Sequence, residues 1–230
     1  MFFCAIFCKK WSLSARHIVL SVFFFILNKK EAYKSMIEKM VLKLVNLMET
    51  KNIIEKANSE YYEYDLVSMA ERIIAVGTML IIGILFNQFV PTILFLVFFL
   101  SLRKRTGGYH ADKFWQCYLV TIVTYMGVIQ VAAVLSEKTS VAMYAVLVLA
   151  VLIIETIGTV NHPNIDLDKG ELRESKRAAR LLVLIEAAVI VTLAVLEINQ
   201  LYVSYMSISI ILCSSLMCLA KILKQEVKVK

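Results

Sequence analysis

The chain contains 230 residues, of which 60% are hydrophobic, and its mean hydropathy is +0.74. Soluble domains contain about 45–50% apolar residues, so this composition excludes a small soluble domain with a single core. The net charge of +7 would suggest a nucleic-acid partner in a soluble protein, but in a membrane protein Lys and Arg mark the cytosolic loops, and we expect no nucleic-acid partner.

Residues 1–35 are interpreted as an N-terminal extension. They include an apolar run over residues 18–27, but ten helical residues rise only about 15 Å, which is half of a bilayer core. The run is either an interfacial segment or part of an upstream extension, and we expect the working domain to cover residues 36–230.

An amphipathic helix is predicted to begin near Met36. Apolar residues recur at helical spacing up to Met48, with Lys and Glu residues between them. Such a helix lies along the cytosolic membrane surface or packs on the protein's own loops, and the sequence leaves both alternatives open.

Six apolar segments follow, each near the length that a helix needs to cross a bilayer, about 17–25 residues. With only 2 Pro and 7 Gly in the chain, long helices are favoured over a many-turned β fold. We therefore predict an all-α, polytopic integral membrane protein with spans at about 69–86, 89–102, 114–135, 141–160, 181–196 and 201–220.

The loop charges orient these predicted spans. One side carries thirteen Lys and Arg residues, whereas the other carries Lys138 alone. Because cytosolic loops are enriched in Lys and Arg, we expect both termini and the basic loops to face the cytosol. The basic residues are Arg103, Lys104, Arg105, Lys113, Lys169, Arg173, Lys176, Arg177, Arg180, Lys221, Lys224, Lys228 and Lys230.

The most concentrated polar site lies between the second and third spans. Gly107 and Gly108 permit a tight turn and the close approach of another backbone. His110 supplies an imidazole that titrates near neutral pH. Cys117 falls near the start of the third span, where the helix N-terminus stabilises an anion. Together they suggest an activated thiolate with a neighbouring base, although a His and a Cys seven residues apart also occur by chance.

The same run resembles the accessory gene regulator B (AgrB) family, the membrane peptidases of bacterial peptide quorum sensing. Arg103, Gly108, the His110-Ala111 pair and Cys117 lie at the spacing of the family motif. Residues 161–164 also resemble the family's second cytosolic loop, although the usual Asn-Lys-Pro-Leu form is altered. The resemblance covers roughly residue 36 to the C-terminus.

The resemblance implies a cysteine endopeptidase in the bacterial cell membrane. Cys117 would be the nucleophile and His110 its general base and later acid. The implied substrate is a precursor signal peptide with an amphipathic N-terminal helix and an acidic tail. Arg103 would bind that tail or brace the loop, and Gly108 would support the site. No cofactor is implied, the cysteines lack paired zinc-site spacing, and a homodimer is compatible with the sequence.

Other interpretations remain open at this stage. Arg103 is a candidate to pair with Glu155 or Glu186, because ionisable residues inside a membrane are costly without a partner. A small peptide transporter would need polar residues along a path across several spans, and the sequence offers few. A membrane scaffold without chemistry is a third alternative.

Overall fold

The computed structural model describes residues 39–55, 58–108, 114–137, 141–161 and 168–224. The chain divides into two compact units, Met1–Phe86 and Asn87–Lys230. The predicted extension over residues 1–35, with Cys4 and Cys8, lies outside the described residues. So do His110 and His162.

In the first unit, residues 39–50 form a helix that is followed by α3 (Ser59–Leu85). Val41 and Val45 of the short helix are buried against α3, in a cluster with Leu66, Val67, Ala70 and Ile74. Part of the predicted amphipathic face therefore packs on a helix of the protein itself.

The same short helix leaves a second apolar stripe uncovered. Met40, Leu44 and Leu47 lie at helical spacing, and each remains about half exposed or more. Their exposure is compatible with a helix that lies on a membrane surface, which stays a prediction.

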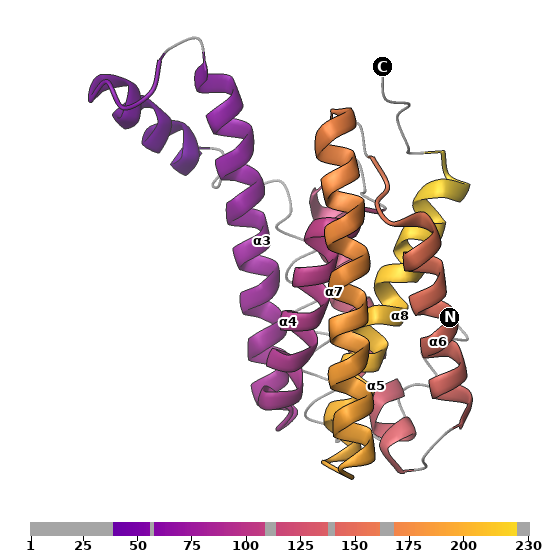
Figure 1. The fold of residues 1–230 in the computed structure, drawn as a ribbon. Coiled ribbons are helices and arrows are strands. Elements are labelled where there is room, and N and C mark those ends of the chain that lie inside the picture. The colour runs from indigo at the N-terminus through magenta and orange to yellow at the C-terminus, as the bar shows by residue number, and fades with distance from the viewer. Residues whose placement is uncertain (1–38, 56–57, 109–113, 138–140, 162–167, 225–230) are drawn as a thin grey trace. The chain divides into compact units, whose positions relative to one another are not determined.

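The second unit consists of α4 (Phe89–Thr106), α5 (Phe114–Glu137), α6 (Val141–Ile157), α7 (Lys169–Val195) and α8 (Gln200–Ile222). These helices run alternately in opposite directions (Figure 1). The C-terminal ends of α4, α6 and α8 therefore lie at the same end of the bundle as the first turns of α5 and α7. We call this the loop end, and it carries the basic clusters of α4, α7 and α8.

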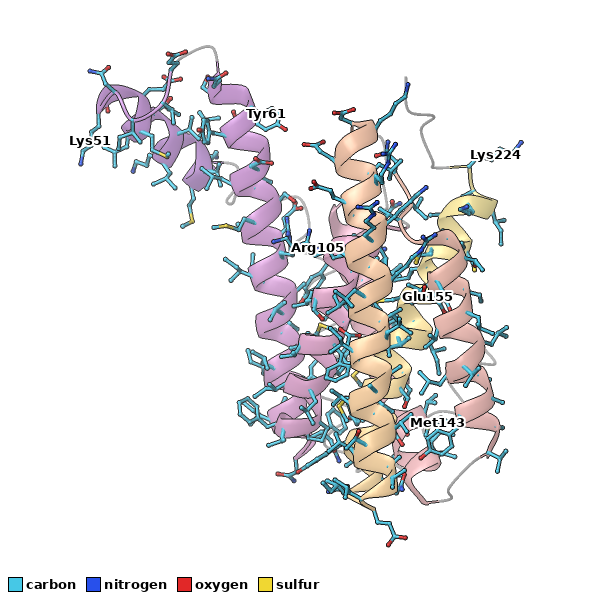
Figure 2. The ribbon with its side chains drawn as sticks, viewed as in Figure 1. Lys51, Tyr61, Arg105, Met143, Glu155 and Lys224 are labelled. Atoms are coloured by element: carbon cyan, nitrogen blue, oxygen red, sulfur yellow. The ribbon has the colours of Figure 1, made fainter. Side chains whose placement is uncertain are left out.

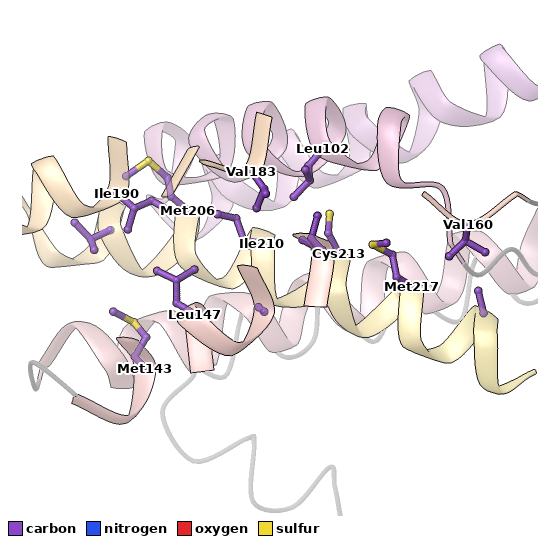
Figure 3. Packing of buried hydrophobic residues seen from close by; sticks show 14 residues of the cluster. Leu102, Met143, Leu147, Val160, Val183, Ile190, Met206, Ile210, Cys213 and Met217 are labelled. Atoms are coloured by element: carbon purple, nitrogen blue, oxygen red, sulfur yellow. The ribbon is translucent and has the colours of Figure 1, made fainter. Parts of the chain in front are cut away.

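α8 is the central helix of the second unit, since it contacts each of the other four. Figure 3 shows the apolar cluster that surrounds it, with Met206, Ile210 and Met217 from α8 itself. Ser204, Ser207 and Ser209 of α8 are also fully buried. Small side chains let helix backbones approach closely in a membrane, which suits a helix enclosed by neighbours.

Helices occupy all six predicted spans, and within the described residues the structure contains no strand, only an isolated bridge. Four helical segments of the described residues are long and apolar enough to cross a membrane. Tyr61–Leu85 belongs to the first unit, and Gln116–Ser136, Lys169–Val195 and Gln200–Ile222 belong to the second. α6 is a shorter apolar helix, and α4 ends in three basic residues. This architecture agrees with the predicted all-α polytopic membrane class, and the number of six spans stays a prediction.

Two helices begin well before the predicted spans that they contain. α3 begins at Ser59 and α7 at Lys169, whereas the spans were predicted from about residues 69 and 181. In α7 the cause is a capping box, in which the Asp168 and Glu171 side chains each accept a hydrogen bond from a backbone N–H at the helix start. Because this cap satisfies orphan N–H groups, the helix begins in the charged segment that precedes the apolar one.

Candidate active site

The polar loop begins where α4 ends. Arg103 lies just beyond the predicted second span, in the last turn of α4, and its Nη1 donates a hydrogen bond to the carbonyl oxygen of Gly107. The same turn is closed by the Gly107 N–H, which donates to the Arg103 carbonyl at 3.2 Å. Arg103 thus holds its own loop through both its side chain and its backbone.

Gly107 and Gly108 adopt backbone angles that favour glycine, with φ of +64° and +119°. A Cβ on Gly107 would lie 2.5 Å from the Val160 carbonyl oxygen. A Cβ on Gly108 would collide with the Arg103 guanidinium and lie 3.2 Å from the Leu216 carbonyl oxygen of α8. The glycine pair therefore allows the turn and the close backbone approach that the sequence suggested.

A second connection, between α6 and α7, fastens this loop. The Val160 N–H donates to the Thr106 carbonyl at 2.9 Å, and Gly107 and Val160 form a parallel bridge. The Arg105 carbonyl accepts hydrogen bonds from Thr159 Oγ1 at 2.9 Å and from Ser175 Oγ of α7 at 3.0 Å. In Figure 2, Arg105 and Lys224 lie toward one end of the second unit and Met143 toward the other.

Cys117 lies at the end of the first turn of α5, half-buried and without a disulfide. Burial lowers the pKa of the Arg103 guanidinium, and Cys213 and Cys117 oppose that shift by their electrostatic effect. Arg103 in the last turn of α4 and Cys117 in the first turn of α5 lie at the same end of the bundle (Figure 1), although they come from different helices.

The structure does not describe His110, so its position relative to Cys117 stays a prediction. Gly108, the last described residue before it, is buried. The chain therefore enters this segment from a buried residue at the loop end, Gly108, and leaves it into the first turn of α5.

Glu155 and Glu186, the two acids considered as partners of Arg103, differ in their surroundings. Glu186 is buried, and its Oε1 accepts a hydrogen bond from Ser101 of α4 at 2.7 Å. This contact ties α7 to α4 within the bundle. At the end of α6, the Glu155 carbonyl accepts a hydrogen bond from Arg180 Nε of α7 at 2.8 Å, so Glu155 is joined to α7 through its backbone.

Thr159 and Ser175 were not identified from the sequence as residues of the site. Their contacts with Arg105 span 54 and 70 residues, and hydroxyl side chains carry no spacing signal over such distances. Within the described part of the chain, His, Cys, Asp and Glu side chains form no group of three that could hold a metal ion.

The fold and the loop end define an all-α membrane protein with a polar site at one end of a helix bundle. The sequence profile described as Accessory gene regulator B matches residues 37–220, which is most of the chain. The chain belongs to the accessory gene regulator B (AgrB) family, whose members take part in accessory gene regulation. Searches of curated proteins and of solved structures each returned no match.

Proposed function

We propose that this protein is a membrane cysteine endopeptidase that cleaves a precursor peptide through an acyl-enzyme thioester, so that a cyclic thiolactone or lactone signal is released. Family membership over residues 37–220 supports the proposal. The observation that carries it is the arrangement of the loop end, where Arg103 is bound to Gly107 in the last turn of α4 and Cys117 lies in the first turn of α5, so that both ends of one motif lie at the same end of the bundle (Figure 1).

In the first chemical step, His110 takes the proton from the Cys117 thiol and the sulfur attacks the carbonyl carbon of the scissile peptide bond. The C–N bond then breaks, His110 returns the proton to the leaving amine, and the peptide remains joined to Cys117 as a thioester. This is the usual division of work between a nucleophile and a neighbouring base.

In the second step, a thiol or hydroxyl within the bound peptide attacks the thioester. The bond to Cys117 breaks, the ring closes, and the proton of the attacking group returns to Cys117. Thioester exchange keeps the activated bond, whereas attack by water would lose it. A site that holds the internal nucleophile close and partly excludes water favours ring closure.

The cations at the loop end support a cytosolic site in the bacterial cell membrane. The basic clusters of α4, α7 and α8 gather at this end of the bundle, as the positive-inside rule requires of a cytosolic face. Their field also complements the acidic tail of a precursor peptide. The Arg103 side chain serves to brace the loop, since it is bound to Gly107.

The test is cleavage of a precursor peptide by the full chain in lipid vesicles. Cys117→Ala should reduce cleavage by roughly 10⁶-fold, which is the scale for loss of a nucleophile. His110→Ala should reduce cleavage by about 10²–10⁴-fold, the usual contribution of a general base.

The matched control is Cys218→Ala, because Cys218 is a free, half-buried cysteine on α8. It should cleave at the rate of the unchanged protein. Cleavage by Cys117→Ala at the unchanged rate would overturn the proposed function.

A further inference from the structure

The end of α4 is closed by residues far along the chain. The last carbonyl groups of a helix lack partners within the helix and must find them elsewhere. Here the Arg105 carbonyl is bound by Thr159 and Ser175, and the Thr106 carbonyl by the Val160 N–H. Two separate elements, the α6–α7 connection and the second turn of α7, thus supply the cap. We call these contacts the brace.

The brace is buried on its Thr106–Val160 side and open to solvent on its other side, where the hydrogen bond from Ser175 to the Arg105 carbonyl is exposed. Thr106 and Val160 are fully buried, and Thr159 and Asn161 are at most 3% exposed. A buried carbonyl that loses its partner costs about 1–3 kcal/mol. The two connections are therefore expected to move as one body, because separating them would leave several buried polar groups without partners.

The brace holds the chain just before the catalytic segment. Arg105 is five residues before His110 in the sequence, and Gly107 lies directly on Val160. The other end of the same segment enters α5, which carries Cys117. The direction in which the chain leaves Gly108 consequently depends on the brace.

We propose that Thr159 and Ser175 are positioning residues for the reaction, which hold the loop end from Arg105 to Gly108 in place through the shared Arg105 carbonyl. This inference rests on the proposed function. It adds two residues outside the motif to the determinants of the reaction. Neither needs to touch the substrate, and each acts through the backbone of Arg105.

The shared acceptor makes the prediction specific. If Thr159→Val removes one hydroxyl, Ser175 still binds the carbonyl, and the reverse holds for Ser175→Ala. Each single variant should therefore change kcat by less than about threefold, whereas the double variant should lower kcat by about 10²-fold, the scale of a misplacement near 1 Å. Residues with a common partner show such non-additivity.

Two further variants separate positioning from folding. Thr159→Ser keeps the hydroxyl, so in the Ser175→Ala background it should retain most of the activity. Thr156→Val is the matched control, because the Thr156 hydroxyl donates only to Ile153 of its own helix and is exposed. It should leave kcat, KM and the melting temperature unchanged.

The second readout is the rate at which iodoacetamide alkylates Cys117, measured on the Cys117 peptide by mass spectrometry. The double variant should slow alkylation toward the rate of His110→Ala, with KM and melting temperature close to those of the unchanged protein. Unchanged kcat and alkylation in the double variant would overturn the inference. So would a loss of activity that only follows a lowered melting temperature.

Alkylation also separates the two proposals. If His110→Ala leaves the alkylation rate of Cys117 unchanged and Cys117→Ala still cleaves the precursor, the proposed function itself fails. If both of those variants behave as proposed and the double variant remains fully active, only the positioning role of Thr159 and Ser175 is lost.

Discussion

The loop end of the second unit and the body of its bundle are held together by different interactions. At the loop end, hydrogen bonds join Arg103 to Gly107 and both Thr159 and Ser175 to Arg105. In the body, apolar side chains of four helices surround α8. Hydrogen bonds depend on direction, whereas apolar packing depends on volume and shape. The loop end should therefore respond to single polar groups, and the body to lost volume.

Among single substitutions that compare the loop end with the body, the largest effect on cleavage is expected at Arg103. Arg103→Leu removes the hydrogen bond to Gly107 and one positive charge of the loop end. Hydrogen bonds of charged groups contribute about 1.5–3 kcal/mol, so cleavage should fall by about 10–10²-fold. Arg103→Lys keeps the charge but not the planar geometry. Its rate of cleavage should lie between the rates of Arg103→Leu and of the unchanged protein. Equal rates for both variants would mean that the positive charge has no part in the effect of Arg103, and a Lys variant as active as the unchanged protein would mean that the planar geometry has none.

A smaller loss is expected from Gly107→Ala. The added Cβ would lie 2.5 Å from the Val160 carbonyl in a backbone conformation with φ of +64°, and such a conformation costs other residues about 1–2 kcal/mol. Cleavage in vesicles should fall by about tenfold or more. Gly127→Ala in α5 is the control, because nothing lies within 4 Å of its added Cβ. If both variants cleave equally well, the close contact between the two connections does not matter for activity.

The smallest effect on cleavage is expected in the body. Ile210 of α8 is fully buried among the surrounding helices, whereas Leu184 of α7 is 52% exposed. Ile210→Ala leaves a cavity and should destabilise the protein by about 2–5 kcal/mol, with little loss of activity below its melting temperature. Leu184→Ala should have the smaller effect on thermal unfolding in detergent. A larger loss of thermal stability in Leu184→Ala than in Ile210→Ala would show that the apolar cluster of Figure 3 is not the core of the bundle.

The same contrast explains what the sequence could predict. Hydropathy located all six helices, because apolar length is a property of each segment alone. Hydropathy marked only the apolar part of α7, whose start at Lys169 is set by the capping box of Asp168 and Glu171, a signal that precedes the apolar run. The glycine pair pointed to a close backbone approach, and Val160 makes it at Gly107.

The brace could not be predicted in the same way. Thr159 and Ser175 contact Arg105 only after α4, α6 and α7 have packed together. A Thr or Ser at these positions has no local pattern that distinguishes it from a solvated loop residue. Spacing within the chain therefore pointed to His110 and Cys117 as the proposed reactive pair, but not to the residues that hold the loop.

The most direct test is to isolate the acyl-enzyme. The full chain in vesicles would be given a precursor whose internal nucleophile is replaced by alanine, so that ring closure is blocked, and its intact mass would be measured. If Cys117 is the nucleophile, the mass should rise by that of the N-terminal cleavage fragment less one water, the adduct should lie on Cys117, and hydroxylamine should remove it. Cleavage of this precursor with an equal adduct on Cys117→Ala, or on a cysteine other than Cys117, would show that Cys117 is not the nucleophile.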